Sequence, residues 1–133
     1  MGTPTDTGVD PGLVMFNYSE RAAKKGYYGV ETTPNGGPTF TNTDYLYPIG
    51  PGQQNVVSVP LTGSYNGDFK AANERAGLTD YVPPGYVWHH VDDFNPVTGK
   101  ATLELVERGA HNAVIPHRGS VAQYSEYYGV DYD

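Results

Sequence analysis

Cysteine is absent from this 133-residue sequence, which excludes both disulfide bonds and thiolate metal sites. Positive charge is scarce, because eight Lys and Arg oppose 15 Asp and Glu and leave a net charge of −7 at pH 7. The charge of the whole chain therefore does not favour a polyanion. Any nucleic-acid ligand would have to be attracted by a local patch and by a metal ion.

Long apolar runs are missing as well. No run approaches the roughly 20 residues of a membrane-spanning helix, and no charged-then-apolar leader is present, so we expect no membrane span. Apolar residues make up 38% of the chain, with 12 Tyr against 4 Phe, and Gly and Pro number 17 and 11. This composition predicts one small, loop-rich α+β domain with a modest core that tyrosines cap.

Turn-forming residues dominate the first part of the chain. Residues 1–12 are typical of a flexible leader, and residues 32–52 contain X-Pro steps and a Gly-Gly pair that favour loops. A brief helix is expected at 18–26. We predict that residues 1–55 form a loop-rich N-terminal extension, packed on or leading into the core, and that residues 56–133 form that core.

The second part shows regular patterning. A strand is expected at 55–62, where β-branched residues alternate with others, and a helix with Asp68 as its N-cap at 68–76. Dense turn chemistry at 92–100 joins two further expected strands into an antiparallel hairpin. These two strands are expected at 86–91 and 101–106. A short helix is expected at 108–114, and a capping box at 120–123 is expected to begin the last helix.

The histidines are concentrated in one stretch of 29 residues. His89 and His90 are adjacent on the first hairpin strand, and His111 and His117 follow the hairpin. Imidazole is the commonest metal ligand and the usual proton acceptor near neutral pH. The helix of a ββα unit returns to the hairpin, so all four rings can converge. Because neighbouring strand residues face opposite ways, His89 and His90 need a bulge or a strand end to enter one site.

These residues resemble a known family. The sequence at 88–99 is WHHVDDFNPVTG, and later blocks at 107–111 and 115–124 and earlier ones at 61–64 and 68–73 also resemble the WHH subgroup of the HNH nucleases. The similarity covers about residues 56–130. One departure is that Tyr65-Asn66 stands where a basic residue is expected near the turn, so a phosphate contact is not supported there.

The resemblance implies a treble-clef-like ββα-metal nuclease. Its members often form the C-terminal toxin module of bacterial polymorphic toxins, each neutralised by an immunity protein. In the related HNH pattern the first residue of the pair binds metal and the second activates water. We therefore assign His89 as a metal ligand and His90 as the general base, against the alternative that one ring only packs.

His111 and His117 are the other candidate ligands, or phosphate contacts, against a structural capping role. They are six residues apart with Pro116 between them, so one is expected on the helix and one just past it. The expected cofactor is one divalent ion, Mg²⁺, Mn²⁺, Ni²⁺ or Zn²⁺. Asn95 either orients the base from the hairpin loop, as a catalytic residue, or only initiates a turn.

The other polar and aromatic residues have two interpretations each. Arg118 and Lys100 are candidates to bind the substrate phosphate or are plain surface charges. Asp92 and Asp93 are loop carboxylates or partners of a histidine. Trp88 is expected in the core, and Tyr124, Tyr127 and Tyr128 are expected either in the core or stacked on a base of the substrate.

The leading hypothesis is a metal-dependent endonuclease, a non-specific DNase that acts as a bacterial toxin. It would be secreted or delivered from one bacterial cell, act in the cytoplasm of the target cell, and be held in check by an immunity protein. The alternatives are an RNase or tRNase, a non-catalytic domain with a structural His-bound zinc, and an acidic protein-binding module. A structural zinc would engage all four imidazoles, whereas a catalytic site leaves one ring free to take a proton.

Overall fold

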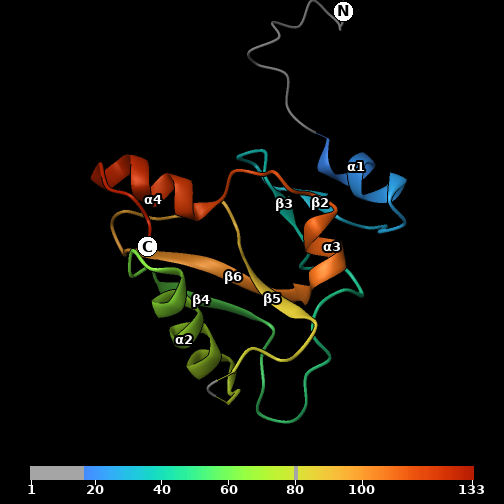
Figure 1. Cartoon of the computed structure of the whole chain (residues 1–133), viewed down its shortest axis with the longest axis horizontal. Helices are drawn as coiled ribbons and strands as arrows, with labels where there is room; N and C mark the ends of the chain where they lie inside the picture. The colour runs from blue at the N-terminus through green and yellow to red at the C-terminus, as the bar shows by residue number, and fades with distance from the viewer. Residues whose placement is uncertain (1–16, 80) are drawn as a thin grey trace, which may run out of the picture.

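The computed structural model describes residues 17–79 and 81–133 (Figure 1). These residues form a small α+β domain in which a three-stranded antiparallel sheet lies between helices, so the predicted fold class is confirmed. The expected leader at 1–12 lies outside the described residues. No helix among the described residues has both the length and the apolar character needed to cross a membrane.

The sheet has the order β4–β6–β5. Strand β5 (Tyr86–His90) pairs with β6 (Lys100–Glu107), which confirms the predicted hairpin, and β4 (Val56–Pro60) pairs with the other edge of β6. In this register His89 lies opposite Glu104, and His90 lies opposite Leu103. The pairing of β4 with β6 was not predictable from the local pattern, which marks a strand but not its neighbour.

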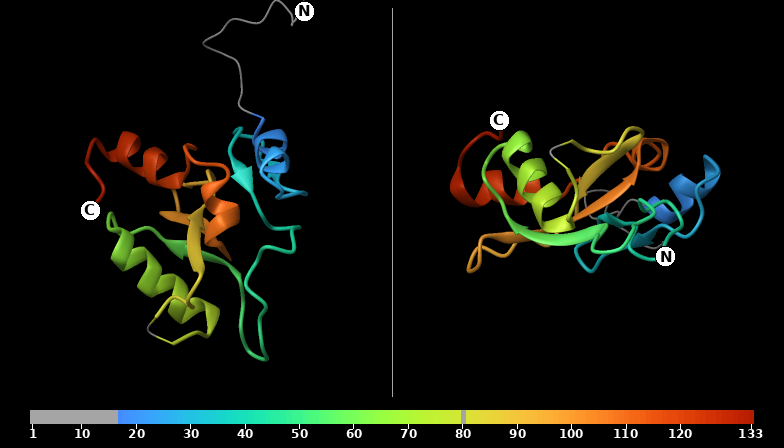
Figure 2. Two further views of the ribbon diagram at one scale, coloured as in Figure 1. Left: turned by 45° about the vertical axis from the view of Figure 1, so that its right-hand side comes forward. Right: turned by 90° about the horizontal axis from the view of Figure 1, so that it is seen from below.

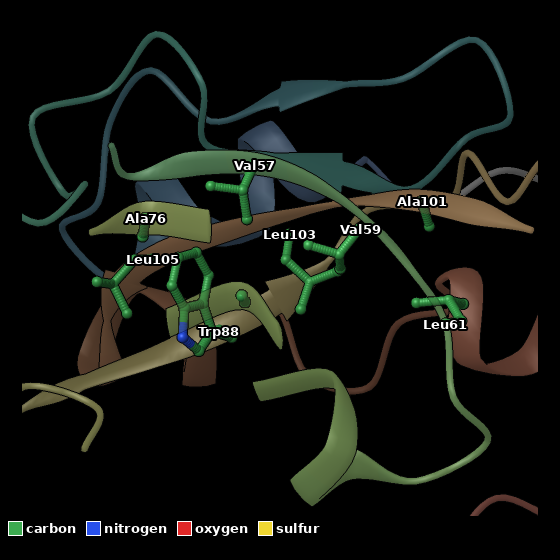
Figure 3. Packing of buried hydrophobic residues seen from close by; sticks show 9 residues of the cluster. Val57, Val59, Leu61, Ala76, Trp88, Ala101, Leu103 and Leu105 are labelled. Atoms are coloured by element: carbon green, nitrogen blue, oxygen red, sulfur yellow. The ribbon is translucent and has the colours of Figure 1, made fainter. Parts of the chain in front are cut away.

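One face of the sheet carries the main core beneath helix α2 (Tyr65–Ala76). Figure 3 shows the indole of Trp88 among apolar side chains of β4 and β6. Trp88 is 2% exposed, and its Nε1–H donates to the side-chain oxygen of Asn73 on α2 at 2.8 Å, which confirms its predicted core position. The buried members of this cluster are Val57, Val59, Leu61, Ala72, Ala76, Trp88, Ala101, Leu103 and Leu105.

The N-cap prediction for α2 is wrong. Ser64 is the N-cap, and its hydroxyl oxygen accepts from the amide of Gly67. Asp68 lies one turn inside the helix, is fully buried, and accepts hydrogen bonds from Thr62. Ser and Asp are equally good caps by local preference, so the choice between them depended on tertiary contacts.

The opposite face of the sheet is covered by the N-terminal part of the chain. Helix α1 (Tyr18–Lys24) and helix α3 (Arg108–Asn112) lie beside the short β2 (Glu31–Thr32) and β3 (Pro38–Thr39) pair (Figures 1 and 2). The described part of the predicted extension is therefore packed on the core, and the boundary at residue 55 stays a prediction. The buried members of this second cluster are Tyr18, Ala22, Val30, Phe40, Val106, Ala110 and Val114.

Helix α4 (Ser120–Tyr128) does not begin with the predicted capping box. Its N-cap is Gly119, which lies so close to the hairpin that an added Cβ would meet the carbonyl oxygen of His90 at 2.5 Å. The Gln123 side chain bonds the backbone of the β5–β6 loop instead. Tyr127 and Tyr128 are 61% and 48% exposed, so their predicted core position is wrong, because this face of α4 has no element above it among the described residues.

Candidate metal centre and active site

His89 is almost wholly buried and carries an unpaired ring nitrogen. Its Nε2 lies 2.9 Å from the carbonyl oxygen of Pro38 in β3. A carbonyl oxygen can only accept, so Nε2 carries the hydrogen and Nδ1 carries a lone pair. Nδ1 is buried without a hydrogen-bond partner, although buried polar atoms are nearly always paired. The site therefore contains a nitrogen lone pair that has no hydrogen-bond partner, and a metal ion can bind such a lone pair.

Two more imidazoles face this nitrogen from other elements. His111 lies on α3, and His117 lies in the loop that follows, just after the cis Ile115–Pro116 bond, as their spacing predicted. One ring nitrogen from each of His89, His111 and His117 lies within 4.8 Å of the others. His117 Nδ1 is 3.2 Å from the carbonyl oxygen of Val114, which leaves its Nε2 with the lone pair.

All three rings are held in the neutral form. Burial lowers the pKa of His89 well below its usual value, and the neighbouring His117 and His111 lower it further. Burial and repulsion from His117 lower the pKa of His111 to about 4, and burial also lowers the pKa of His117. Neutral imidazoles are the ligand form, and backbone carbonyls fix the orientation of two of the rings. The residues present therefore fit a divalent first-row ion.

Metal-free protein should lose stability on mild acidification. Below about pH 6.5 the unfolded chain binds a proton at residue 111 that the folded chain does not bind until about pH 4. The unfolded state thus holds more protons in this window, so the free energy of unfolding falls as the pH falls, by roughly 2–3 kcal/mol at its lower end. Urea unfolding in EDTA at several pH values measures this, with His111→Gln as the variant that removes the contribution of residue 111 and so reduces the pH slope. An equal pH slope in both proteins would contradict it.

His90 is bonded to a buried carboxylate on the other face of β5. Its Nε2 lies 2.9 Å from Oδ2 of Asp68, which also accepts from the hydroxyl of Tyr132. Burial raises the pKa of Asp68, but the bonds from His90, Tyr132 and Thr62 outweigh it and lower the pKa overall. An ionised carboxylate only accepts, so His90 Nε2 carries the hydrogen and Nδ1 is the basic nitrogen.

His90 and two of the three clustered histidines line one cavity of about 500 Å³. His90 lines it together with His111 and His117, and Tyr65 and Phe69 of α2 lie beside the His90 ring. The three-ring cluster does not include His90, because strand alternation sends His89 and His90 to opposite faces, but His90 ends β5 and so still lines the same cavity as His111 and His117. Three rings form a cluster, and the fourth stands across the cavity with a carboxylate partner.

Two buried carboxylates beside the histidines are not predicted as site residues by the sequence. The local pattern predicts Asp68 as a helix cap and predicts no role for Glu104 within its strand. Glu104 accepts from the hydroxyls of Thr39 and Thr41 and from the amide of Phe40, and its Oε1 is 4.0 Å from His89 Nε2. It thus holds β3, and with it the Pro38 carbonyl, against His89. A lone Glu between two leucines of a buried strand was the available signal.

The other predicted site residues lie away from this cavity. Asn95 caps its own turn by accepting from the Val97 amide, and it bridges to Lys100 at the start of β6. The guanidinium of Arg118 donates hydrogen bonds to both carboxylate oxygens of Glu126 on α4. Arg118 also lines a hollow next to His117. Catalytic and phosphate-binding roles for these residues stay predictions.

Asp92 and Asp93 hold backbone rather than histidines. Asp92 is buried and accepts from the Gly37 amide and the Thr33 hydroxyl, while Asp93 accepts from the amide and hydroxyl of Thr102. The loop interpretation of both residues is consistent with these bonds.

Comparison with protein families agrees with this geometry. Residues 80–127 match the family WHH, described as a nuclease of the HNH/ENDO VII superfamily with conserved WHH. This segment of the chain is therefore similar to the WHH nucleases. The match includes Trp88, His89 and His90, and it spans β5, β6, α3 and nearly all of α4. No curated protein matches the chain.

The family match supports a hydrolytic nuclease and implies a nucleic-acid substrate. Nucleases of the HNH type use a divalent metal ion, and the His89–His111–His117 cluster could bind one. Residues before 80 are outside the match but supply Asp68, Pro38 and the α2 wall of the cavity.

Proposed function

We propose that this protein is a metal-dependent endonuclease in which His90 is the general base and His89, His111 and His117 bind the metal ion. The observation that carries the proposal is one cavity that His90 lines together with His111 and His117. His111 and His117 cluster with the buried His89, whose Nδ1 has no hydrogen-bond partner, whereas His90 is bonded to an ionised carboxylate.

The chain's own residues supply the proton transfer. With Nε2–H donated to Asp68, Nδ1 of His90 can take a proton from a water molecule that attacks the phosphodiester. Asp68 keeps the ring in this tautomer and stabilises the imidazolium that results, as a carboxylate does behind any histidine base. A divalent ion, when bound, supplies positive charge to the phosphate oxygens.

The donor set favours one group of ions. Three nitrogen ligands suit Zn²⁺, Ni²⁺ or Mn²⁺ better than Mg²⁺, which prefers oxygen ligands and retains water. A structural zinc site is the weaker alternative, because His90 is engaged by Asp68 and stands apart from the cluster. Such a site would use the fourth ring as well.

DNA is the proposed substrate, cut without sequence preference. The described helices include no basic recognition helix that would read a base sequence, and phosphate chemistry alone needs none. The resemblance to WHH nucleases further supports a role as a bacterial toxin module, delivered to the cytoplasm of a target cell and inhibited by an immunity protein. Suppression of toxicity by the product of a neighbouring reading frame would test the proposed inhibition by an immunity protein.

A substrate and metal panel tests the core of the proposal. The protein is incubated with supercoiled plasmid, with duplex and single-stranded oligonucleotides, and with total RNA, each with Zn²⁺, Ni²⁺, Mn²⁺ or Mg²⁺ and with EDTA. We expect DNA cleavage with at least one imidazole-preferring ion and none in EDTA. RNA cleavage without DNA cleavage would contradict the DNase assignment, and inactivity under every ion would overturn the proposal.

A further inference from the structure

The few positive charges of this acidic chain are unevenly placed. Eight Lys and Arg are present in 133 residues, and three of them, Arg21, Lys24 and Lys25, fall within five residues at the end of α1. Positions three and four apart share one side of a helix, so these side chains lie together. They border a hollow of about 300 Å³ that Glu20 also lines. Three positive side chains and one negative side chain give the lining of this hollow a net charge of +2. We refer to Arg21, Lys24 and Lys25 as the α1 basic surface.

This surface lies directly against the segment that joins two of the clustered histidines. Arg21 Nη1 donates to the carbonyl oxygen of Pro116, and Lys25 Nζ donates to that of Ala113, both at 3.4 Å. The buried Tyr18 ring of the same helix packs edge-on against the ring of His117. Figure 2 shows α1 beside α3 in both views, on the side of the sheet away from α2.

The large cavity adjoins a hollow that Tyr18 of α1 also lines. A second hollow, of about 440 Å³, is lined by Tyr18, Pro116, His117 and Arg118, and it shares Pro116 and His117 with the large cavity that contains His90. A polymer that occupies the large cavity can therefore continue past His117 toward α1. Lys24 and Lys25 of α1 are exposed, whereas Arg118 is already paired with Glu126.

We propose that the α1 basic surface binds the phosphodiester backbone of the nucleic-acid substrate on one side of the bond that is cleaved. This inference rests on the proposed nuclease function and adds where the substrate lies. Repulsion from a chain of net charge −7 opposes a polyanion, and a local cation cluster beside the catalytic cavity offsets that repulsion where the substrate must enter. Backbone contacts of this kind position the substrate and carry no sequence preference.

The test compares two charge-matched double variants. Lys24→Gln/Lys25→Gln removes two charges from the α1 basic surface, and Gln can keep a donor near the Ala113 carbonyl. Lys70→Gln/Arg75→Gln removes two exposed charges from α2, which lies on the other side of the sheet (Figure 1). Binding of a labelled 20-base-pair duplex is measured by fluorescence anisotropy in EDTA across a salt series, and cleavage is measured separately with metal.

The α1 variant should bind roughly tenfold or more weakly at 100 mM salt, and its slope of log affinity against log salt should be smaller by about 1.8, the value for two lost phosphate contacts. Its KM should rise with little change in kcat. The α2 variant should match wild type. Equal losses in both variants, or no change in either, would overturn the inference while wild-type cleavage leaves the nuclease proposal intact. A wild-type protein that cleaves nothing would instead overturn the nuclease proposal.

Discussion

Replacing His90 by alanine should lower kcat for phosphodiester cleavage by roughly 10²–10⁴, the usual contribution of a general base. The reason is that His90 is the one histidine with a carboxylate behind it and a basic Nδ1 at the cavity. Metal binding should persist, because the His89–His111–His117 cluster does not include this ring. Single-turnover cleavage and isothermal titration with Zn²⁺ or Ni²⁺ measure the two properties on the same preparation.

Two milder variants separate a base from a packing residue. Asp68→Asn keeps the size of the side chain but removes the charge that stabilises protonated His90, so kcat should fall while KM stays near its wild-type value. Tyr132→Phe removes only the hydroxyl that shares Oδ2 of Asp68, so its loss should be smaller. Full activity of His90→Ala, with folding verified by circular dichroism, would show that the base lies elsewhere.

Replacing His117 by alanine should abolish tight metal binding and, with it, cleavage. A conserved orientation partner of a ligand is commonly worth 10–100-fold in metal affinity, so loss of the ligand itself should exceed roughly 100-fold. His117 is the preferred position for this test because it is only half-buried in a loop, whereas His89 is in the core and its loss would disturb folding. Titration calorimetry at pH 7 measures the affinity directly.

His90→Ala is the matched control for this second experiment. It removes the same side chain from the same cavity, and it should lose cleavage but retain metal, whereas His117→Ala should lose both. If His117→Ala binds metal as tightly as wild type, this ring is not a ligand and the cluster is a packing feature. Excess metal should not restore the activity of His90→Ala.

Local patterns were sufficient for much of the fold and of the site. Alternation and turn residues predicted the β5–β6 hairpin, and the spacing across Pro116 predicted that His111 and His117 would lie on and just past a helix. The WHH resemblance predicted the nuclease family. These features depend on residues near one another in the chain, where backbone geometry follows directly from residue type.

Helix ends and burial were less predictable. Ser64 rather than Asp68 caps α2, and Gly119 rather than a capping box begins α4, because Asp68 is drawn into bonds with Thr62 and His90 and because Gly119 packs on the His90 backbone. Each choice was made by a contact with a segment distant in sequence. Local preference ranks such caps nearly equally.

The sequence by itself determined which reactive groups are present: four histidines without cysteine, few cations, and a WHH hairpin that is similar to a nuclease family. Only the tertiary structure decided which of these groups lie together. Strand alternation places His89 with His111 and His117 and sends His90 to Asp68, and the packing of α1 on the opposite face brings three cations beside His117. Apart from the pair His111 and His117, the partners in these contacts are 22 to 99 positions apart in the chain, and folding alone selects such partners.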